Sequence, residues 1–414
     1  METMRVRCCI AGGGPAGMML GYLLARAGVD VVVLEKHPDF LRDFRGDTVH
    51  PSTLEVMFEL GLLDEFLRRP HTEIRRFSGR INGTMVEIAD LSHVPTRCKF
   101  IALMPQWDFL NFLAEHGARY PTFRLLMRAE ADDLIVEDGR VAGVRATTAD
   151  GPLEIRADLV VGADGRHSTM RARAGFTVRD FGAPIDVLWM RLTKQPDDPL
   201  SVLGSFDRGR LFVTLDRGDY WQCAMVIPKG GLDALRARGL PALQAEIAAI
   251  APFDGDRANE LRSWDDVKLL TVVVDRLDRW YRPGLLCIGD AAHAMSPMGG
   301  VGINIAIQDA VAAANILAEP LRTGRAGERD LAAVQRRRMF PVRITQSAQV
   351  FVADRVFGKI GAGAPAATKR PPLPFPLKLL QWFPYLRRLP ARFLAVGVRP
   401  EHVRTPELAT PRSA

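Results

Sequence analysis

Three mostly apolar runs predict strands that are buried on both faces: Val6–Ala11, Ala157–Val161 and Gly284–Ile288. Strands of parallel sheets covered by helices are apolar at every position rather than at every second one. After the first run comes an apolar stretch of helical length, Pro15–Ala27, and then another apolar run, Val29–Glu35. This order of strand, helix and strand predicts a parallel sheet with a right-handed crossover.

A different pattern, in which apolar and polar residues alternate, extends from about Phe176 to Val274. Within it, Arg210–Pro228 is typical of two antiparallel strands joined by a turn at Asp216–Asp219. A shorter patch of the same kind spans about Phe77 to Leu91. We therefore predict an α/β protein with two interleaved domains. They are a nucleotide-binding domain of residues 1–75, 98–175 and 270–345, an antiparallel-sheet substrate domain of residues 76–97 and 176–269, and a helical, proline-rich C-terminal segment of residues 346–414.

Composition and charge narrow the class of protein. The chain has 414 residues, 47% of them hydrophobic, and a formal net charge of +7, which suits a globular protein with a sizeable core. Its basic residues are dispersed and no aromatic-and-basic recognition motif accompanies them, so we expect no nucleic-acid partner. No stretch reaches the ~20 uninterrupted apolar residues of a spanning helix, so we expect no transmembrane segment.

The segment Lys369–Pro400 combines basic residues with Leu, Phe and Trp. One interpretation is a patch that contacts a membrane surface or a lipophilic substrate. The alternative, which we favour, is a segment folded back over the core, because its prolines break any long amphipathic helix. Peripheral membrane contact stays possible on the sequence alone.

The five cysteines form no CxxC pair and no cluster with histidine at metal-ligand spacing. We therefore expect no metal site, and small core cysteines in a reduced, cytoplasmic protein.

A glycine-rich loop, Gly12–Gly17, follows the first predicted strand, opens the first predicted helix and fits G-x-G-x-x-G. Gly12 permits a tight turn, Gly14 lets a pyrophosphate approach the backbone, and Gly17 lets helix and strand pack closely. Glu35 ends the next strand, where a carboxylate accepts from ribose hydroxyls and disfavours a 2′-phosphate. The loop thus predicts FAD or NAD rather than NADP. The residues assigned to this end of the cofactor are Gly12, Gly14, Pro15, Ala16, Gly17, Glu35 and Lys36.

A second glycine-rich turn, near residue 300, favours FAD, which extends beyond its pyrophosphate into a ribityl chain and a three-ring isoalloxazine. Asp290 follows a buried strand and can accept from ribityl hydroxyls. A helix beginning near Gly300 directs its positive end at the flavin edge that becomes anionic on reduction. The residues assigned to this end are Asp290, Pro297, Gly300, Val301, Gly302 and Asn304.

These two motifs, together with Gly162–Arg171 between them, resemble the FAD-dependent aromatic hydroxylases, the p-hydroxybenzoate hydroxylase-like family. The resemblance covers roughly residues 5–345. It implies a Rossmann-like FAD-binding domain of the glutathione reductase type. It also implies that NAD(P)H reduces FAD, that O2 adds at flavin C4a, and that the hydroperoxide hydroxylates or epoxidises a small aromatic substrate. A monomer or homodimer is expected.

Further site residues come from the same resemblance. Asp164 matches the middle motif, as do Gly165, Ser168 and Arg171. Arg45 and Gln106 resemble residues beside the flavin, although a surface arginine and a helix-cap amide are equally good interpretations. Three strand aromatics are candidate substrate contacts, with simple sheet packing as the alternative: Trp189, Tyr220 and Trp221.

No acid/base pair stands out in the sequence, so no catalytic side chain is assigned. This fits chemistry that belongs mostly to the cofactor. The nearest alternative is an FAD-dependent reductase or dehydrogenase of the same fold, for example one acting on prenyl chains. A non-catalytic flavin-binding protein is a second alternative, and the absence of a W-x-W sequence counts against a flavin halogenase.

Overall fold

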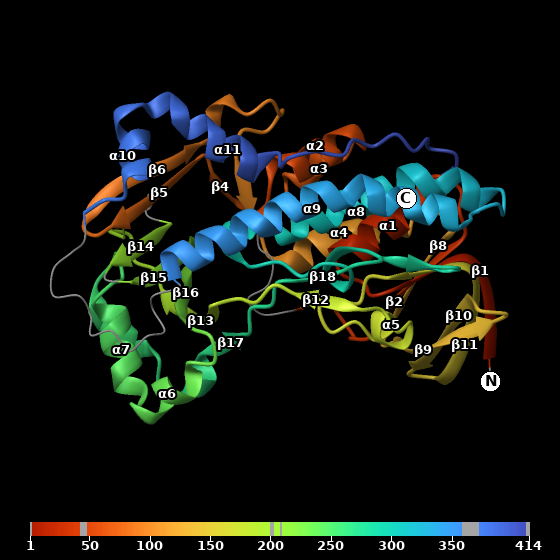
Figure 1. The fold of residues 1–414 in the computed structure, drawn as a ribbon, viewed down its shortest axis with the longest axis horizontal. Coiled ribbons are helices and arrows are strands. Elements are labelled where there is room, and N and C mark those ends of the chain that lie inside the picture. The colour runs from red at the N-terminus through yellow and green to blue at the C-terminus, as the bar shows by residue number, and fades with distance from the viewer. Residues whose placement is uncertain (1, 42–47, 199–202, 208, 358–371, 411–414) are drawn as a thin grey trace.

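Two large sheets lie at opposite ends of the long axis of the molecule, and a long helix, α9 (Glu328–Phe357), runs between them (Figure 1). The computed structural model describes residues 2–41, 48–198, 203–207, 209–357 and 372–410. Arg45 lies outside the described residues.

The first sheet has eight strands, and its centre is parallel. The parallel strands, in spatial order, are β20 (Leu285–Cys287), β11 (Gly151–Gly162), β1 (Glu2–Ala11), β2 (Val31–Glu35) and β8 (Phe123–Met127). Antiparallel strands complete it: β19 (Tyr281–Arg282) beside β20, and β10 (Arg140–Thr148) and β9 (Glu130–Glu137) beside the first half of β11. The sequence predicted strands β1, β2, β11 and β20, although β11 begins six residues before the predicted run.

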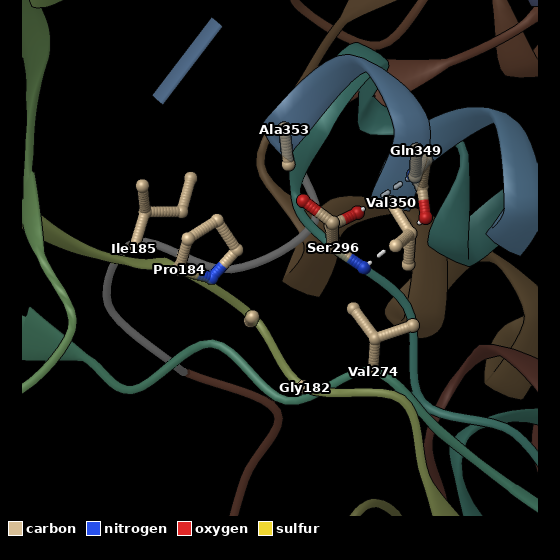
Figure 2. A pocket seen from close by; sticks show the side chains of 9 residues that line it. Gly182, Pro184, Ile185, Val274, Ser296, Gln349, Val350 and Ala353 are labelled. Atoms are coloured by element: carbon tan, nitrogen blue, oxygen red, sulfur yellow. Dashed lines mark hydrogen bonds between the residues drawn. The ribbon is translucent and has the colours of Figure 1, made fainter. Parts of the chain in front are cut away.

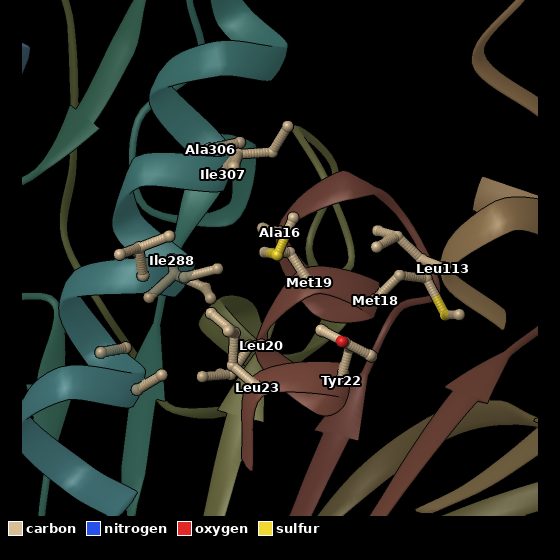
Figure 3. Close-up of a cluster of buried hydrophobic side chains, with 14 of the residues drawn as sticks. Ala16, Met18, Met19, Leu20, Tyr22, Leu23, Leu113, Ile288, Ala306 and Ile307 are labelled. Atoms are coloured by element: carbon tan, nitrogen blue, oxygen red, sulfur yellow. The ribbon is translucent and has the colours of Figure 1, made fainter. Parts of the chain in front are cut away.

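Three helices bury one face of this sheet: α1 (Pro15–Arg26), α4 (Gln106–Gly117) and α8 (Gly302–Arg322). In Figure 3, Ala16 and Leu20 of α1 lie towards Ala306 and Ile307 of α8, whereas Tyr22 lies towards α4. Among the described residues one helix, Met298–Arg322, is long and apolar enough to cross a membrane, and 78% of its most apolar window is buried inside the protein. That burial is typical of the core helix of a globular domain.

The second sheet has seven strands. Their order is β17 (Lys268–Leu270), β13 (Ile185–Thr193), β16 (Tyr220–Pro228), β15 (Arg210–Asp216), β14 (Gly204–Asp207), β5 (Arg76–Ile81) and β6 (Thr84–Asp90). The predicted strand pair within 210–228 is confirmed, with its turn between Asp216 and Tyr220. Because side chains alternate between faces, the sheet separates two apolar clusters. One packs under α6 (Leu232–Ala237) and α7 (Leu240–Ala248), and the other faces the first sheet and its helices.

Trp221 belongs to the cluster under α6 and α7. Its Nε1 donates to Asp198, 2.6 Å away, and Asp198 also forms a buried ion pair with Arg257. Hydrogen bonds from Arg257 hold the pKa of Asp198 at about 2, below its ordinary value. Asp198 is therefore a buried carboxylate that links Trp221 to Arg257 inside the domain built on the second sheet.

We expect Asp198 to give the protein acid sensitivity. Because its folded pKa is depressed, the ionised form stabilises the fold by about 2 kcal/mol above pH ~4, and roughly half of this is lost at pH ~3. The free-energy difference in unfolding between the parent and Asp198→Asn should therefore shrink from pH 7 to pH 3. A difference that is constant with pH would contradict this role. Asp219→Asn, at an exposed site with side-chain exposure of 78%, is the control.

The C-terminal segment forms short helices rather than one long one, as its prolines predicted. They are α10 (Phe375–Trp382) and α11 (Arg388–Ala395), joined by a 3₁₀ turn, Pro384–Arg387. Both helices pack on β6, and Ala391 and Ala395 are buried there. The remaining helices and strands are β3 (Thr48–Val49), α2 (Pro51–Glu59), α3 (Leu63–Phe66), β4 (Thr72–Ile74), β7 (Ile101–Leu103), α5 (Thr169–Arg173), β12 (Val178–Asp180) and β18 (Asp275–Leu277).

Candidate functional site

The motifs singled out in the sequence lie at the carboxyl ends of neighbouring parallel strands. Ala11 at the end of β1 is in register with Gly162 of β11, and Gly162 is in register with Cys287 of β20. The loops that follow, beginning at Gly12, Ala163 and Ile288, therefore meet at one edge of the sheet. Ligands of open α/β sheets bind at this edge.

The loop Gly12–Gly17 has room for a ligand on one side only. A Cβ on Gly12, whose φ is +109°, would lie 2.4 Å from the carbonyl oxygen of Ala163. A Cβ on Gly17 would lie 1.9 Å from the carbonyl oxygen of Gly12, whereas one on Gly14 would meet no atom within 4 Å. Gly14 thus marks an open cradle at the N-terminus of α1, where free N–H groups favour an anion. This geometry fits the pyrophosphate of FAD.

Glu35 is buried behind this loop and shapes it. Its Oε2 accepts from the backbone N–H of Gly13 at 3.2 Å, and its Oε1 accepts from that of His37 at 3.0 Å. Lys36, in contrast, points to solvent and forms an exposed ion pair with Glu130 at 3.5 Å. The carboxylate assigned to ribose therefore also holds the phosphate loop in place.

We expect Glu35→Ala to weaken FAD binding by roughly 10- to 100-fold, because it removes two charge-assisted hydrogen bonds of about 1–2 kcal/mol each. The dissociation constant of FAD, titrated by quenching of flavin fluorescence, measures this. Lys36→Ala is the matched control and should bind FAD as the parent does. Equal affinity of both variants would remove Glu35 from the site.

The second loop touches the first directly. A Cβ on Gly289 would lie 3.1 Å from the Cβ of Ala16 and 3.3 Å from that of Ala306, so the starts of α1 and α8 meet across this glycine. Asp290, the next residue, is part-exposed, with its Oδ2 4.0 Å from Nη2 of Arg166. Asp290 and Gly14 consequently border the same edge of the sheet, as one extended cofactor requires.

The turn Pro297–Gly302 leads into α8 and has backbone conformations that favour glycine. Gly299 and Gly300 both have positive φ, +76° and +63°, and a Cβ on Gly300 would lie 2.3 Å from Oγ1 of Thr48. Val301 is the N-cap of α8 and Gly302 its first residue. The backbone thus comes close to β3 on one side and presents the positive end of a long helix on the other.

Asn304 holds this turn with its whole side chain. Its Oδ1 accepts from the N–H of His50 and from Oγ1 of Thr53, at 2.9 and 2.7 Å. Its Nδ2 donates to the carbonyls of Thr48 and Gly300, each at 3.2 Å. The sequence assigned Asn304 to the cofactor. Its side-chain amide, however, makes these four hydrogen bonds to other protein groups, so the side chain positions the turn.

Two other assigned residues also have local roles. Both carboxylate oxygens of Asp164 are engaged at the start of α5, accepting from Ser168 at 2.5 Å and from the N–H of Met170 at 3.0 Å. Burial raises the pKa of Asp164 above its ordinary value, while these donors act in the opposite direction. Gln106 is the half-buried first residue of α4; Pro105 is the N-cap, and the Gln106 amide makes no capping hydrogen bond within the part of the chain that the structure describes.

The sequence analysis missed a contribution from the C-terminal segment. A Cβ on Gly299 would lie 2.9 Å from Cδ2 of Leu394 in α11, and Nδ1 of His50 lies 2.7 Å from the carbonyl oxygen of Leu394. Burial lowers the pKa of His50 to about 4, so it stays neutral. No motif marks Leu394; only the fold brings it beside the turn at residue 299.

A buried charge network lies behind Gly289. Asp309 of α8 accepts from Arg338 at 2.8 Å and from the N–H of Gly289 at 3.1 Å, and Nε2 of His293 lies 2.5 Å from it. Arg338 also pairs with Glu401, at 3.3 Å. His293 is thus a structural partner of Asp309, which agrees with leaving it out of catalysis. Buried charges of this kind are stable only when paired.

The face of the seven-stranded sheet that looks towards the first sheet is apolar. Trp189 lies on it, packed in the cluster that also receives Met298 from the glycine turn. Tyr220 shares this face by strand alternation but lies at the opposite end of β16 from Pro228. The Cζ atom of Arg191 stacks over its ring, 3.8 Å from the ring centroid. Trp221 points to the opposite face, away from Trp189 and the glycine turn, because a one-residue step along a strand reverses the side chain.

A small cavity of about 10 Å³ adjoins this face (Figure 2). Ile185, Ala353 and Ser296 are among the residues that line it, and the backbone of Ser296 is hydrogen-bonded to Gln349 of α9. Ser296 directly precedes the glycine turn, so this small cavity lies where that turn, β13 and α9 come together. Within the described residues no group of His, Cys, Asp and Glu could hold a metal ion.

Comparisons with known proteins agree with this geometry. A family model described as an FAD binding domain matches residues 5–348. The 6-methylpretetramide 4-monooxygenase of Streptomyces rimosus is 34% identical over 374 residues, which are 88% of this chain and 89% of that protein. The para-nitrophenol 4-monooxygenase of Pseudomonas sp. strain WBC-3 is 26% identical over 82% of this chain and 84% of its own length.

Solved structures share the fold. PqsL of Pseudomonas aeruginosa, described as a probable FAD-dependent monooxygenase, superposes with a TM-score of 0.73 at 25% identity, covering 86% of this chain and 99% of its own. OxyS anhydrotetracycline hydroxylase of Streptomyces rimosus superposes with a TM-score of 0.72 over 95% of this chain and 76% of its own, at 22% identity. The chain therefore belongs to the FAD-dependent aromatic hydroxylases, the p-hydroxybenzoate hydroxylase-like monooxygenases, and is an FAD-dependent oxidoreductase.

Proposed function

We propose that the protein uses NAD(P)H and O2 to hydroxylate an apolar aromatic substrate held between the seven-stranded sheet and the turn at residues 297–302. The observation that carries this is the apolar sheet face that meets Met298 of that turn. Bound FAD supplies the redox chemistry and the activation of oxygen. A cytoplasmic location is part of the proposal, supported by five free, buried cysteines.

The chain's own residues bind, orient and exclude water. Backbone N–H groups at the start of α1 would hold the pyrophosphate of bound FAD, and Asp290 would accept from its ribityl hydroxyls. The positive end of α8 favours negative charge on the flavin edge. Apolar side chains on the sheet face keep water from the reacting atoms. Among the described residues, none in this region is placed as a protein acid or base for the reaction.

The sheet face also indicates the substrate class. Its apolar cluster contains aliphatic and aromatic residues: Ile185, Val187, Trp189, Leu211, Val213, Ala224, Val226 and Leu270. A substrate with a large apolar surface gains about 25 cal/mol for each Å² buried there. Gln222, 3% exposed, lies on the same face by alternation, and its Nε2 has no hydrogen-bond partner among the described residues. We infer an extended aromatic substrate that carries a hydrogen-bond acceptor, such as a carbonyl.

The decisive experiment follows NAD(P)H oxidation during a screen of one-ring and fused-ring aromatic compounds, followed by mass spectrometry of products formed under 18O2. A fused-ring compound should stimulate oxidation and gain one labelled atom. Turnover that continues without oxygen would replace the proposal with a reductase. A flavin that NAD(P)H never bleaches would replace it with a binding protein.

Trp189 should contribute to substrate affinity and Trp221 should not. We expect Trp189→Ala to raise KM at least ~10-fold, because it removes an aromatic contact worth about 1.5–3 kcal/mol. Trp221→Phe is the matched control: it keeps the ring on the opposite face and should leave KM unchanged while lowering thermal stability. If the two variants changed KM equally, the sheet face would not be the substrate site.

A further inference from the structure

The segment 372–389 carries large apolar side chains into solvent. No residue of α10 is buried, and none is buried in the 3₁₀ turn that follows. The exposed fractions are 63% for Phe375, 62% for Trp382, 44% for Phe383, 62% for Tyr385 and 68% for Leu389. Single exposed apolar residues are ordinary, but a contiguous group of five marks an interaction surface.

The elements that carry these side chains, α10, the 3₁₀ turn and α11, contact one another and β6, so the side chains lie in one region of the surface. The rings of Phe375 and Trp382 lie 6.4 Å apart, and those of Phe383 and Tyr385 lie 6.1 Å apart. Nε2 of Gln381 donates to the carbonyl of Met85 in the edge strand β6, at 3.2 Å. Met85 is itself 47% exposed and extends the apolar surface.

The segment that carries the patch is basic. Residues 372–400 contain five basic residues and no aspartate or glutamate. Arg387 is neutralised by Glu87 of β6, at 3.3 Å, whereas Arg388 and Arg392 are exposed. Trp and Tyr, with an apolar ring and a polar tip, favour the headgroup layer of a bilayer. Basic residues beside them are attracted by anionic lipids.

We propose that this aromatic–basic patch (Phe375, Trp382, Phe383, Tyr385, Leu389, Arg388 and Arg392) docks on a bilayer surface that contains anionic lipids. A second copy of the chain is a poor occupant, because two patches of the same positive sign would repel one another. A neutral protein groove would leave the arginines uncompensated.

Docking at this place would bring the proposed active site close to apolar substrates dissolved in the bilayer, an advantage that rests on the proposed function. The patch continues directly into α11, whose Leu394 contacts Gly299 of the flavin turn. It also rests on β6, the edge strand of the sheet that holds the proposed substrate face. An aromatic substrate that partitions into the bilayer would thus be concentrated on the side of the molecule nearest the site.

The test is flotation of the FAD-loaded full chain with phosphatidylcholine vesicles, with and without roughly one-third phosphatidylglycerol. We expect binding to the anionic vesicles, weakened when NaCl rises from about 0.05 to about 0.5 M. Arg388→Gln/Arg392→Gln should bind about 25-fold more weakly, at about five-fold for each arginine. Trp382→Ser/Phe383→Ser should abolish binding.

Matched controls are Arg336→Gln, exposed on α9, and Leu408→Ser, 54% exposed beside the end of α1; both should bind as the parent does. Should a patch variant fold poorly, the intact chain still decides, through its preference for anionic vesicles and its salt dependence. Equal binding to neutral vesicles, no binding, equal losses in the controls, or patch variants that split a dimer would each overturn the proposal.

Discussion

Replacing Gly17 by alanine should abolish FAD binding. The new Cβ would lie 1.9 Å from the carbonyl oxygen of Gly12 and 3.2 Å from Cγ2 of Ile10. Neither neighbour can move freely, because one is backbone of the phosphate loop and the other is a core side chain of β1. Helix α1 must therefore shift away from the sheet, at a cost of about 1–3 kcal/mol in stability. A loss of FAD affinity of at least ~100-fold should accompany it, measured by fluorescence titration.

Gly14→Ala separates binding from folding. A Cβ there meets no protein atom within 4 Å, and the φ of −74° suits alanine. The apoprotein should melt at the parent temperature, yet FAD should bind at least ~10-fold more weakly, because the methyl group enters the space expected for the pyrophosphate. If Gly14→Ala binds FAD as tightly as the parent, this loop does not hold the cofactor.

Replacing Arg338 by methionine should strongly destabilise the fold. Arg338 and Asp309 are both fully buried, and Glu401 is nearly so, with side-chain exposures of 0%, 0% and 1%. Methionine fills most of the space but leaves two carboxylates without their shared cation. Breaking a buried pair in this way costs about 3–5 kcal/mol. Urea unfolding of the holoenzyme measures the loss.

The control for that variant lies two residues earlier on the same helix. Arg336 is exposed, so Arg336→Met should change the free energy of unfolding by no more than about 0.5 kcal/mol. Similar losses in the two variants would show that the network contributes nothing specific. A second consequence is functional: because Asp309 also accepts from the N–H of Gly289, Arg338→Met should loosen Asp290 and weaken FAD retention.

Most of the parallel sheet was predictable because its strands are mainly apolar on both faces and three of them are followed by a glycine motif; β8 was not predicted. Gly12, Gly162 and Gly289 each follow an apolar run, and parallel topology alone brings the three to one edge. The antiparallel strands at 210–228 were predictable from strict alternation. The boundaries of β11 were not, since its first half is half-exposed and pairs with β10.

Side-chain roles at the site were less predictable than the loops themselves. Asn304 and Asp164 have the residue types of cofactor ligands, but their partners, such as Thr48 and Ser168, become apparent only in three dimensions. The orientation of Trp221 depends on strand register, which composition does not reveal. Leu394 carries no chemical signal at all, and 95 residues separate it from Gly299.

The contact of Leu394 with Gly299 and the pairing of Arg338 with Glu401 have a consequence for biosynthesis. The adenosine end of the cofactor site is built from residues that leave the ribosome early, whereas its ring end is braced by residues translated more than 90 positions after the glycine turn. Domains generally fold from the N-terminus during synthesis. A nascent chain can thus bind the nucleotide half of FAD well before the residues that brace the isoalloxazine site have been translated and folded.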